Sequence, residues 1–320
     1  MGRLGLLAPE KVLVLPCEDY TEESLRRAVE VALEQFLPGD LSGARVLVKP
    51  NLVAPRQASL SCTHPATVRA VCEGLLARGA EVRVGDSPAF GTTRSVARAA
   101  GLLAALKGLP VRLVSFRKKV RVALSCGLTV GLAREALCAD LLVNLPRLKA
   151  HNQLLLTAAV KNLFGCVVGL EKPLLHARLG ERGDLFFRMI LEVAELLPVG
   201  LNLLDAVVAM EGQGPTGGRP RKLGYLFASG HPLALDTVLY QALGLSPEKV
   251  PLWKTALDLR LFGARPEEAV VEGDLPDLSD FQLPLRLSPV TFHPLRLLRG
   301  MLRRLLLRLR SGFLGIKEFS

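Results

Sequence analysis

Short runs of β-branched and leucine residues alternate with amphipathic segments along the chain, which predicts strands separated by helices. The strands expected from these runs are 11–15, 45–49, 81–85, 111–116, 140–144, 200–205 and 223–228. The expected helices are 22–36, with Thr21 as its cap, 65–77, 92–100, 185–196 and 231–243. Strands and helices at this spacing predict an α/β fold, with a largely parallel sheet covered by helices on both faces.

Polar residues follow several of these predicted strands at the point where each strand ends. They are Lys49, Asn51, Asp86, Ser87, Asn144 and Asp205. Ligands of open α/β sheets bind beyond the carboxyl ends of the strands. If the strands are parallel, these side chains converge on one edge of the sheet, opposite Lys149 and His151. The alternative for each is local structure only, such as a strand end, a turn or a helix cap.

The stretch 141–176 concentrates basic residues in apolar sequence. It holds Lys149, His151, Lys161, Lys172 and His176 among leucine, alanine and valine, with Glu171 as its only acid. A buried ammonium group without a partner is very costly, so the pattern predicts an anion pocket. Lysine can bind carboxylate or phosphate as a point charge, and histidine can transfer protons near neutral pH. The catalytic candidates are therefore His151, Lys161 and His176.

The remaining candidates would bind substrate or metal. The expected substrate-binding residues are Lys49, Asn51, Ser87, Asn144, Lys149, Asn162, Lys172, Gly212 and Gly214. The two glycines lie in the segment 211–220, which is expected to be a loop whose N–H groups could approach an anion. Four carboxylates, Asp86, Asp205, Glu211 and Asp236, could hold a divalent cation such as Mg²⁺ through oxygen ligands. For Asp236, pairing with one of the lysines is an equal alternative.

Composition favours a globular, intracellular protein. The chain has 320 residues, of which 49% are hydrophobic and 22% charged, enough for a large core. We expect one α/β domain over 1–285 and a basic tail over 286–320. No apolar run reaches the roughly 18 residues of a membrane span, and the start lacks a signal-peptide pattern. The six cysteines are scattered, which favours reduced thiols in a cytoplasm.

The net charge of +11 is concentrated at the C-terminal end. Residues 281–320 hold eight basic residues and one acidic residue, whereas residues 1–280 hold 33 and 29. Aromatic residues make up 5% of the chain and do not alternate with basic ones, so nucleic-acid binding is not expected.

The tail segment 293–310 projects as an amphipathic helix, with arginines on one side and leucines with one methionine on the other. Three interpretations remain open. The helix could cover the apolar surface of the body, lie on anionic lipid, or dock an acidic redox protein.

Several ordered motifs resemble the domain-of-unknown-function family 362. The motifs are VLVKPNLV at 46–53, VRVGDSPAF at 82–90, VNLPRLKAH at 143–151, LTAAVKNLFGCVVGLEK at 156–172, LDAVVAMEGQGPTGG at 204–218 and ASGHPLALD at 228–236. The resemblance covers roughly residues 11–285.

Many proteins that resemble this family continue into a ferredoxin-like segment with iron–sulfur motifs. Here no cysteine follows Cys166, so an intrinsic 4Fe–4S cluster is not expected, although a separate ferredoxin-like protein could be a partner. Two functions fit these observations. One is an enzyme that acts on a small anionic metabolite or cofactor by acid/base chemistry, with a redox-linked pathway implied by the relatives. The other is a non-catalytic module that binds a cofactor or docks a redox partner.

Overall fold

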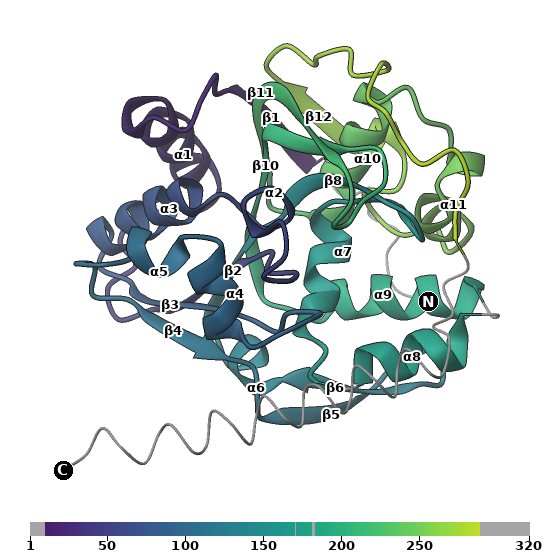
Figure 1. Cartoon of the computed structure of the whole chain (residues 1–320), viewed down its shortest axis with the longest axis horizontal. Coiled ribbons are helices and arrows are strands. Elements are labelled where there is room, and N and C mark those ends of the chain that lie inside the picture. Colours follow the sequence, from purple (N-terminus) through teal and green to yellow (C-terminus); the bar gives the residue numbers. More distant parts are fainter. Residues whose placement is uncertain (1–9, 170, 181–182, 289–320) are drawn as a thin grey trace, which may run out of the picture.

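The computed structural model describes residues 10–169, 171–180 and 183–288 (Figure 1). The strands are β1 (Glu10–Pro16), β2 (Arg45–Pro50), β3 (Glu81–Asp86), β4 (Arg112–Ser115), β5 (Lys119–Ala123), β6 (Thr129–Ala133), β7 (Leu141–Leu145), β8 (Arg147–His151), β9 (Leu155–Thr157), β10 (Val199–Glu211), β11 (Arg219–Ser229) and β12 (Ala269–Glu272). The amphipathic segment 293–310 lies outside the described residues.

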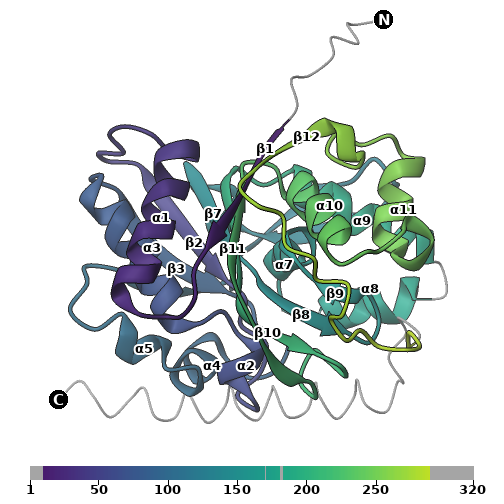
Figure 2. The same ribbon diagram turned by 90° about the horizontal axis from the view of Figure 1, so that it is seen from above.

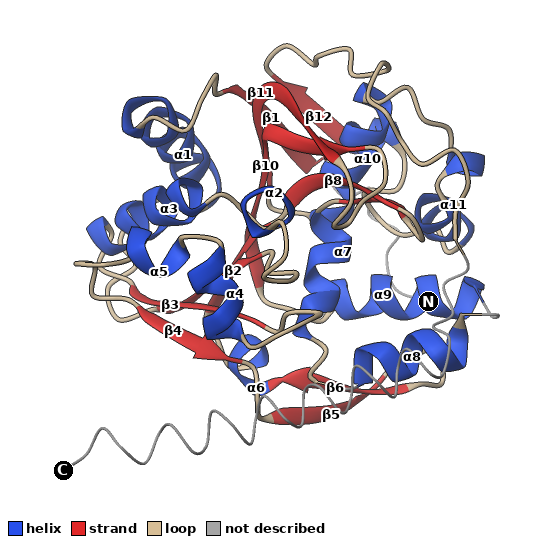
Figure 3. Ribbon diagram, in the orientation of Figure 1, coloured by secondary structure: helices blue, strands red, loops and turns tan. Residues whose placement is uncertain are grey.

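Helices and single turns connect these strands (Figure 3). The α-helices are α1 (Glu22–Phe36), α2 (Ala58–Ser61), α3 (Pro65–Ala77), α4 (Thr93–Ala99), α5 (Leu102–Ala105), α6 (Arg134–Leu137), α7 (Ala159–Leu163), α8 (Glu171–Leu179), α9 (Gly183–Glu195), α10 (Pro232–Ala242) and α11 (Pro251–Asp258). The 3₁₀ turns are η1 (Phe164–Cys166), η2 (Pro247–Lys249) and η3 (Pro266–Glu268). None of the described helices has the length and apolar character needed to cross a membrane.

One large sheet organises the molecule, with strand order β12-β1-β11-β10-β7-β2-β3-β4. The pairs from β10 through β7, β2 and β3 to β4 are all parallel, whereas β11 pairs antiparallel with both β10 and β1. Strand β8 runs parallel to part of β10 and forms a hairpin with β9. The predicted α/β class with a largely parallel sheet is therefore confirmed.

Helices cover both faces of this sheet (Figure 2). One core packs α1, α3, α4 and α5 against one face, and the other cores pack α7, α9, α10 and α11 against the opposite face. Side chains alternate along each strand, so Val46 and Val48 of β2 enter the first core and Leu47 enters the second. By the same alternation, Lys49 at the end of β2 points to the α7 side.

Three differences from the sequence prediction concern this sheet. The hairpin β8–β9 was not expected, although RLKAH alternates polar and apolar residues; in the structure all five residues of β8 are buried. Strand β10 continues to Glu211, well past the expected end at 205. The loop expected at 211–220 is correspondingly shorter, since β10 ends at Glu211 and β11 begins at Arg219.

Candidate functional site

A row of polar residues crosses the middle of the sheet at one level. Lys49 of β2 is in register with Asn144 of β7, Asn144 with Asn202 of β10, and Asn202 with Ser229 of β11. Leu47, Leu142 and Phe227, their neighbours two residues along three of these strands, belong to the cores on the α7 and α10 side. The whole row therefore faces that side, directly beneath α7.

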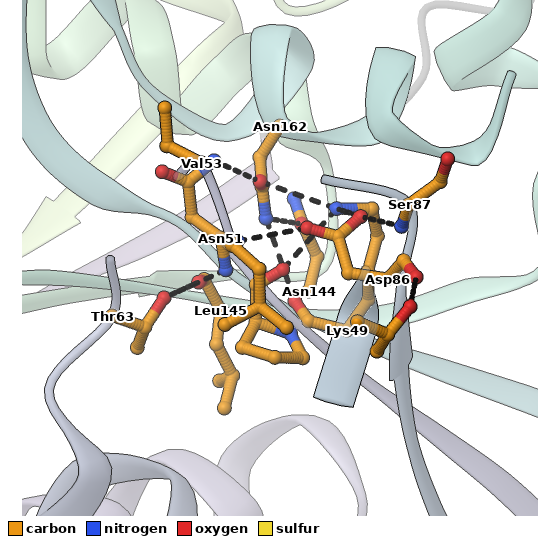
Figure 4. Close-up of polar contacts among 12 residues, drawn as sticks. Lys49, Asn51, Val53, Thr63, Asp86, Ser87, Asn144, Leu145 and Asn162 are labelled. Atoms are coloured by element: carbon orange, nitrogen blue, oxygen red, sulfur yellow. Dashed lines mark hydrogen bonds and ion pairs between the residues drawn. The ribbon is translucent and has the colours of Figure 1, made fainter. Parts of the chain in front are cut away.

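Asn162 of α7 connects this row to the loop after β2 (Figure 4). Its side-chain oxygen accepts from Lys49 Nζ at 3.2 Å and from Asn51 Nδ2 at 2.7 Å. Its Nδ2 donates to Asn144 Oδ1 at 2.8 Å, and Asn144 Nδ2 donates to Asn202 Oδ1 at 2.8 Å. A continuous chain of amides thus runs across three strands under α7.

Lys49 and Asp86 form an ion pair at the centre of this network. Lys49 Nζ lies 2.9 Å from Asp86 Oδ1, and both side chains are almost fully buried, at 0% and 2% exposed. Asp86 also accepts from the backbone N–H of Leu52 and of Ser87, each at 2.8 Å. These two N–H bonds and the lysine satisfy the carboxylate, so Asp86 is fixed in place.

Three further lysines surround this pair. Lys149 of β8 donates to Asn51 Oδ1 and, at 2.7 Å, to the carbonyl of Ser61. Lys172 of α8 donates to the carbonyl of Ser87. The Nζ of Lys161, on α7, lies 4.6 Å from the centre of the Phe164 ring. We call Lys49, Lys149, Lys161 and Lys172 with Asp86 the lysine cluster.

The lysines of this cluster lower one another's pKa. Burial, together with neighbouring cations that include Arg147 and Lys49, lowers the pKa of Lys149 to about 7 against the opposing effects of Cys62 and Asp86. Burial followed by Lys172, Lys149 and Lys49 lowers the pKa of Lys161 to about 7 as well. Glu171 does not compensate, because it accepts from Gly131 N at 2.7 Å and pairs with Arg121 on the β5–β6 hairpin.

The two histidines of the stretch lie beside the lysine cluster. Burial lowers the pKa of His151 well below its usual 6.5, and Lys161, Lys149 and His176 lower it further. His151 Nδ1 accepts from Gln153 N at 3.1 Å, which leaves the hydrogen of the neutral ring on Nε2. The buried ring of His176 packs against Phe164, with centroids 5.8 Å apart, and against Phe186, with centroids 4.6 Å apart.

The structure separates the four carboxylates that were expected to hold a divalent cation. Among the described residues, no group of three or more His, Cys, Asp or Glu side chains could hold a metal ion. Asp86 pairs with Lys49, and Glu211 accepts from Arg219 Nε at 2.8 Å and from Gln282 N at 3.2 Å. The expectation of a shared carboxylate site is therefore wrong for these residues.

Asp236 has a different partner from either of those expected. Its two oxygens accept from the N–H groups of Ala159 at 2.7 Å and Val160 at 3.1 Å, at the start of α7. Burial raises the pKa of Asp236 to about 7, although these two hydrogen bonds oppose the rise. Asp236 therefore holds the helix that carries Lys161 and Asn162, and it neither pairs with a lysine nor joins a metal site.

Asp205 belongs to a neighbouring polar cluster. Because it alternates with Asn202 and Leu204, it faces the α1 and α3 side, where it accepts from Tyr20 Oη at 2.7 Å and from His64 N at 3.0 Å. Arg147 of β8 lies 3.6 Å from the same carboxylate. We call Arg147, Asp205, Tyr20 and His64 the arginine cluster. A cavity of about 470 Å³ adjoins it, lined by Tyr20, Gln57, Ser59, Leu60, His64, Arg147, Val208, Gly218 and Pro220.

The two loop glycines do not offer free N–H groups to an anion. Gly212 N donates to the carbonyl of Gln282 at 2.7 Å, and Gly214 N donates to that of Gly212 at 3.2 Å. A Cβ on Gly214 would lie 1.8 Å from the carbonyl oxygen of Ala150, so this glycine is required for close packing on β8. The N–H groups of both glycines are therefore occupied within the protein, and their expected substrate-binding role stays a prediction. Ser87 contacts the cluster through its backbone.

Gly165 is a residue of the site that the sequence analysis missed. A Cβ at this position would lie 2.6 Å from Lys49 Nζ and 2.8 Å from Asp86 Oδ1. The ion pair therefore packs directly against the backbone of η1. The available signal was its place in the motif KNLFG, four residues after Lys161.

The family of the chain follows from comparison with known sequences. The model of the Domain of unknown function (DUF362) matches residues 46–241, which include every residue of the lysine cluster. The chain belongs to the DUF362 family. A thylakoid-associated protein (sll1697) of Synechocystis sp. is 35% identical over 317 residues, covering 93% of this chain and 95% of that protein.

Two solved structures align with part of this DUF362 member. The lactate racemase apoprotein from Thermoanaerobacterium thermosaccharolyticum aligns with a TM-score of 0.46 at 14% identity, over 70% of this chain and 54% of that one. A protein from Thermotoga maritima aligns with a TM-score of 0.38 at 12% identity, over 66% and 56%.

Proposed function

We propose that this DUF362 protein is an enzyme that binds a small anionic metabolite or cofactor, through a carboxylate or phosphate group, at the lysine cluster. The observation that carries the proposal is the gathering of lysines: Lys49, Lys149 and Lys161 interact electrostatically with one another, and of these three only Lys49 forms an ion pair within the described residues, with Asp86. Uncompensated buried cations are costly, and an anionic ligand would remove that cost. Lys149, Lys161 and Lys172 are the residues proposed to contact the anion.

The pKa values of two lysines in the cluster favour a role in proton transfer over simple binding. Acid/base catalysis is most efficient when the pKa of the group lies near the working pH, and Lys149 and Lys161 both have a pKa of about 7. His151 and His176 stand beside them as further proton carriers. A non-catalytic carrier does not require side chains whose pKa lies near the working pH.

The proposal is tested first by binding. Isothermal titration of the full-length protein with inorganic phosphate, pyruvate and citrate should detect at least one ligand. That affinity should fall at least tenfold in Lys149→Met. The matched control is Lys254→Met, because Lys254 is exposed and paired with Asp258. No binding of any of the three anions, or equal losses in both variants, would contradict an anion site at the lysine cluster.

Catalysis is tested once a converted substrate has been found among such anions. His151→Ala should then lower kcat and leave the affinity nearly unchanged, because a proton carrier acts on the reaction and does not hold the ligand. A variant that loses only affinity would favour the alternative, a cofactor-binding or docking module.

We further propose that the chain contacts anionic membranes peripherally through residues 293–310. The arginines on one side of this segment and the leucines on the other support the proposal, as does the thylakoid-associated relative. The protein should co-sediment with vesicles containing phosphatidylglycerol, and salt should weaken the association. Deletion of residues 293–320 should abolish it. Failure of the intact protein to bind at low salt would leave packing on the body or an acidic redox protein as the partner of this segment.

A further inference from the structure

Lys161 differs from the other lysines of the cluster in what surrounds its ammonium group. Lys49 has three acceptors, Asp86 at 2.9 Å and both Asn162 and the carbonyl of Pro50 at 3.2 Å. Lys149 has two acceptors and Lys172 donates to Ser87. Within the described residues, Lys161 has no hydrogen-bond acceptor, and its nearest recorded neighbour is the face of the Phe164 ring.

The charged groups around Lys161 also favour its neutral form. Lys172 on α8, Lys149 on β8 and Lys49 on β2 lower its pKa, and burial lowers it more than any of them. His151 interacts with it electrostatically, and His176 packs edge-to-face with the same Phe164 ring. The acceptors of Lys149 hold its protons in place, so Lys161 is the lysine that releases a proton first. A lysine among cations in an apolar setting is an activated amine nucleophile.

We propose that Lys161 is a covalent catalyst that forms a Schiff base with an aldehyde or ketone bearing a carboxylate, such as a 2-oxo acid. The proposal rests on the anion site proposed above and names its substrate class. Lys149 uses two of its three N–H donors, so the third can bind the carboxylate and place an adjacent carbonyl carbon near the amine. Phe164 supplies an apolar wall for that carbon.

Binding of the carboxylate leaves Lys161 reactive. Lys49 and Asp86 neutralise one another, and Lys172 and Lys149 are the other cations that lower the pKa of Lys161. A single carboxylate cancels one of them, and the remaining charge continues to disfavour an ammonium form of Lys161. A second anionic group on the ligand would restore the proton to Lys161, so a monocarboxylate fits better than a dicarboxylate.

The step balances without an oxidant or reductant. The Lys161 nitrogen attacks the carbonyl carbon, and one N–H proton passes to the carbonyl oxygen, which gives a carbinolamine. The second N–H proton then leaves with the hydroxyl group as water when the C=N bond forms. His151 and His176 are the side chains beside Lys161 that can carry these protons between nitrogen and oxygen.

The test is reductive trapping in the full-length protein. Pyruvate and glyoxylate are each added with sodium borohydride at pH 7, and the modified residue is located by peptide mass spectrometry. Labelling should occur at Lys161 and be lost in Lys161→Arg. The control Lys254→Arg should label as the wild type does. The rate of labelling should rise through a pH of about 7, because the amine form of Lys161 becomes dominant there, well below the usual lysine value of 10.5.

Four results would decide against this role. Labelling at Lys149, or a rate that rises only near the ordinary lysine pKa, would overturn the assignment to Lys161. Phosphate or pyruvate binding by titration without trapping by either probe would refute the Schiff base and leave the anion site intact. Absence of both binding and trapping would refute the proposed function together with this inference.

Discussion

The two polar clusters described above lie next to each other on β8. They differ in whether the buried cation that β8 contributes is paired with a carboxylate. Arg147 and Lys149 are two residues apart on this strand, so their side chains leave the same face. Arg147 finds Asp205 at 3.6 Å, the carbonyls of Cys62 at 3.1 Å and Ser59 at 3.4 Å, and that of Val208. Lys149 finds only neutral oxygens, and its charged neighbours are mostly cations.

The difference separates a structural cluster from the proposed binding site. In the arginine cluster, the cation meets a carboxylate and the remaining donors meet carbonyls, so no charge is left for a ligand. In the lysine cluster, cations outnumber carboxylates, which adds nothing to the stability of the fold. The first cluster should therefore respond to mutation with a loss of stability, and the second with a loss of binding.

The largest effect is expected from Asp205→Ala. Arg147 would keep its buried charge without a counter-charge, and breaking such a pair typically costs about 3–5 kcal/mol of unfolding free energy. Urea denaturation measures the change. The control is Asp280→Ala, whose exposed pair with Arg221 should contribute at most about 1 kcal/mol. A loss for Asp205→Ala no larger than that of the control would show that the arginine cluster is not structural.

Tyr20→Phe should destabilise the same cluster by about 1.5–3 kcal/mol, because its hydroxyl donates to a charged carboxylate. The hydroxyl also accepts from Val208 N at 3.1 Å, so a second partner is left unsatisfied. Tyr225→Phe is the matched control, since the described residues give its hydroxyl no partner, and it should change stability by no more than about 0.5 kcal/mol. Thermal and urea unfolding of the two variants provide the comparison.

Gly165→Ala tests the lysine cluster by crowding its ion pair. The added methyl group would overlap Lys49 Nζ and Asp86 Oδ1, and overpacking of this kind costs about 1–3 kcal/mol. Gly183→Ala is the control, because its nearest atom lies 3.6 Å away at ordinary contact distance. Anion affinity should fall along with stability in Gly165→Ala alone. Unchanged affinity would place the ligand away from the Lys49–Asp86 pair.

The smallest expected effect is an increase in unfolding free energy, and its size depends on pH. Lys161→Met removes a buried cation, so below pH 7 it should raise unfolding free energy by about 1 kcal/mol, a value discounted for partial exposure. Between pH 7 and 10.5 the unfolded wild type binds more protons than the folded form, so wild-type stability rises with pH. The advantage of the variant should therefore shrink across this range. A constant difference from pH 6 to 10 would refute the lowered pKa.

Regular elements were largely predictable from the sequence, because periodicity and capping are local. The expected helices 22–36 and 65–77 coincide with α1 and α3, and Thr21 caps α1 by accepting from Ser24 N. Strand β8 was missed for a physical reason. Its sequence RLKAH alternates polar and apolar residues, but the strand is only five residues long and all five are buried, so its polar side chains do not mark a solvent-exposed face.

Site residues at the ends of strands could be predicted from the sequence. Residues whose contacts come from distant segments of the chain could not. Lys49, Asn144 and Asp86 do come together, since neighbouring parallel strands end at one edge. Asp205 was placed with them because β10 was expected to end there. The strand continues, and alternation sends this side chain to the opposite face. Nothing near Tyr20 in the sequence indicates that it binds a residue 185 positions away.

The amide chain under α7 has a single direction, and this fixes how protons can reach the cluster. Asn51, Asn162, Asn144 and Asn202 each donate to the next acceptor, and the chain ends on the carbonyls of Ser229 and Gly230. Every amide therefore presents its oxygen toward the lysines and its nitrogen away from them. Amide groups do not ionise near neutral pH, so the chain cannot relay protons and acts as a fixed array of aligned dipoles. Under the proposed function, His151 and His176 are the groups that exchange protons with the cluster.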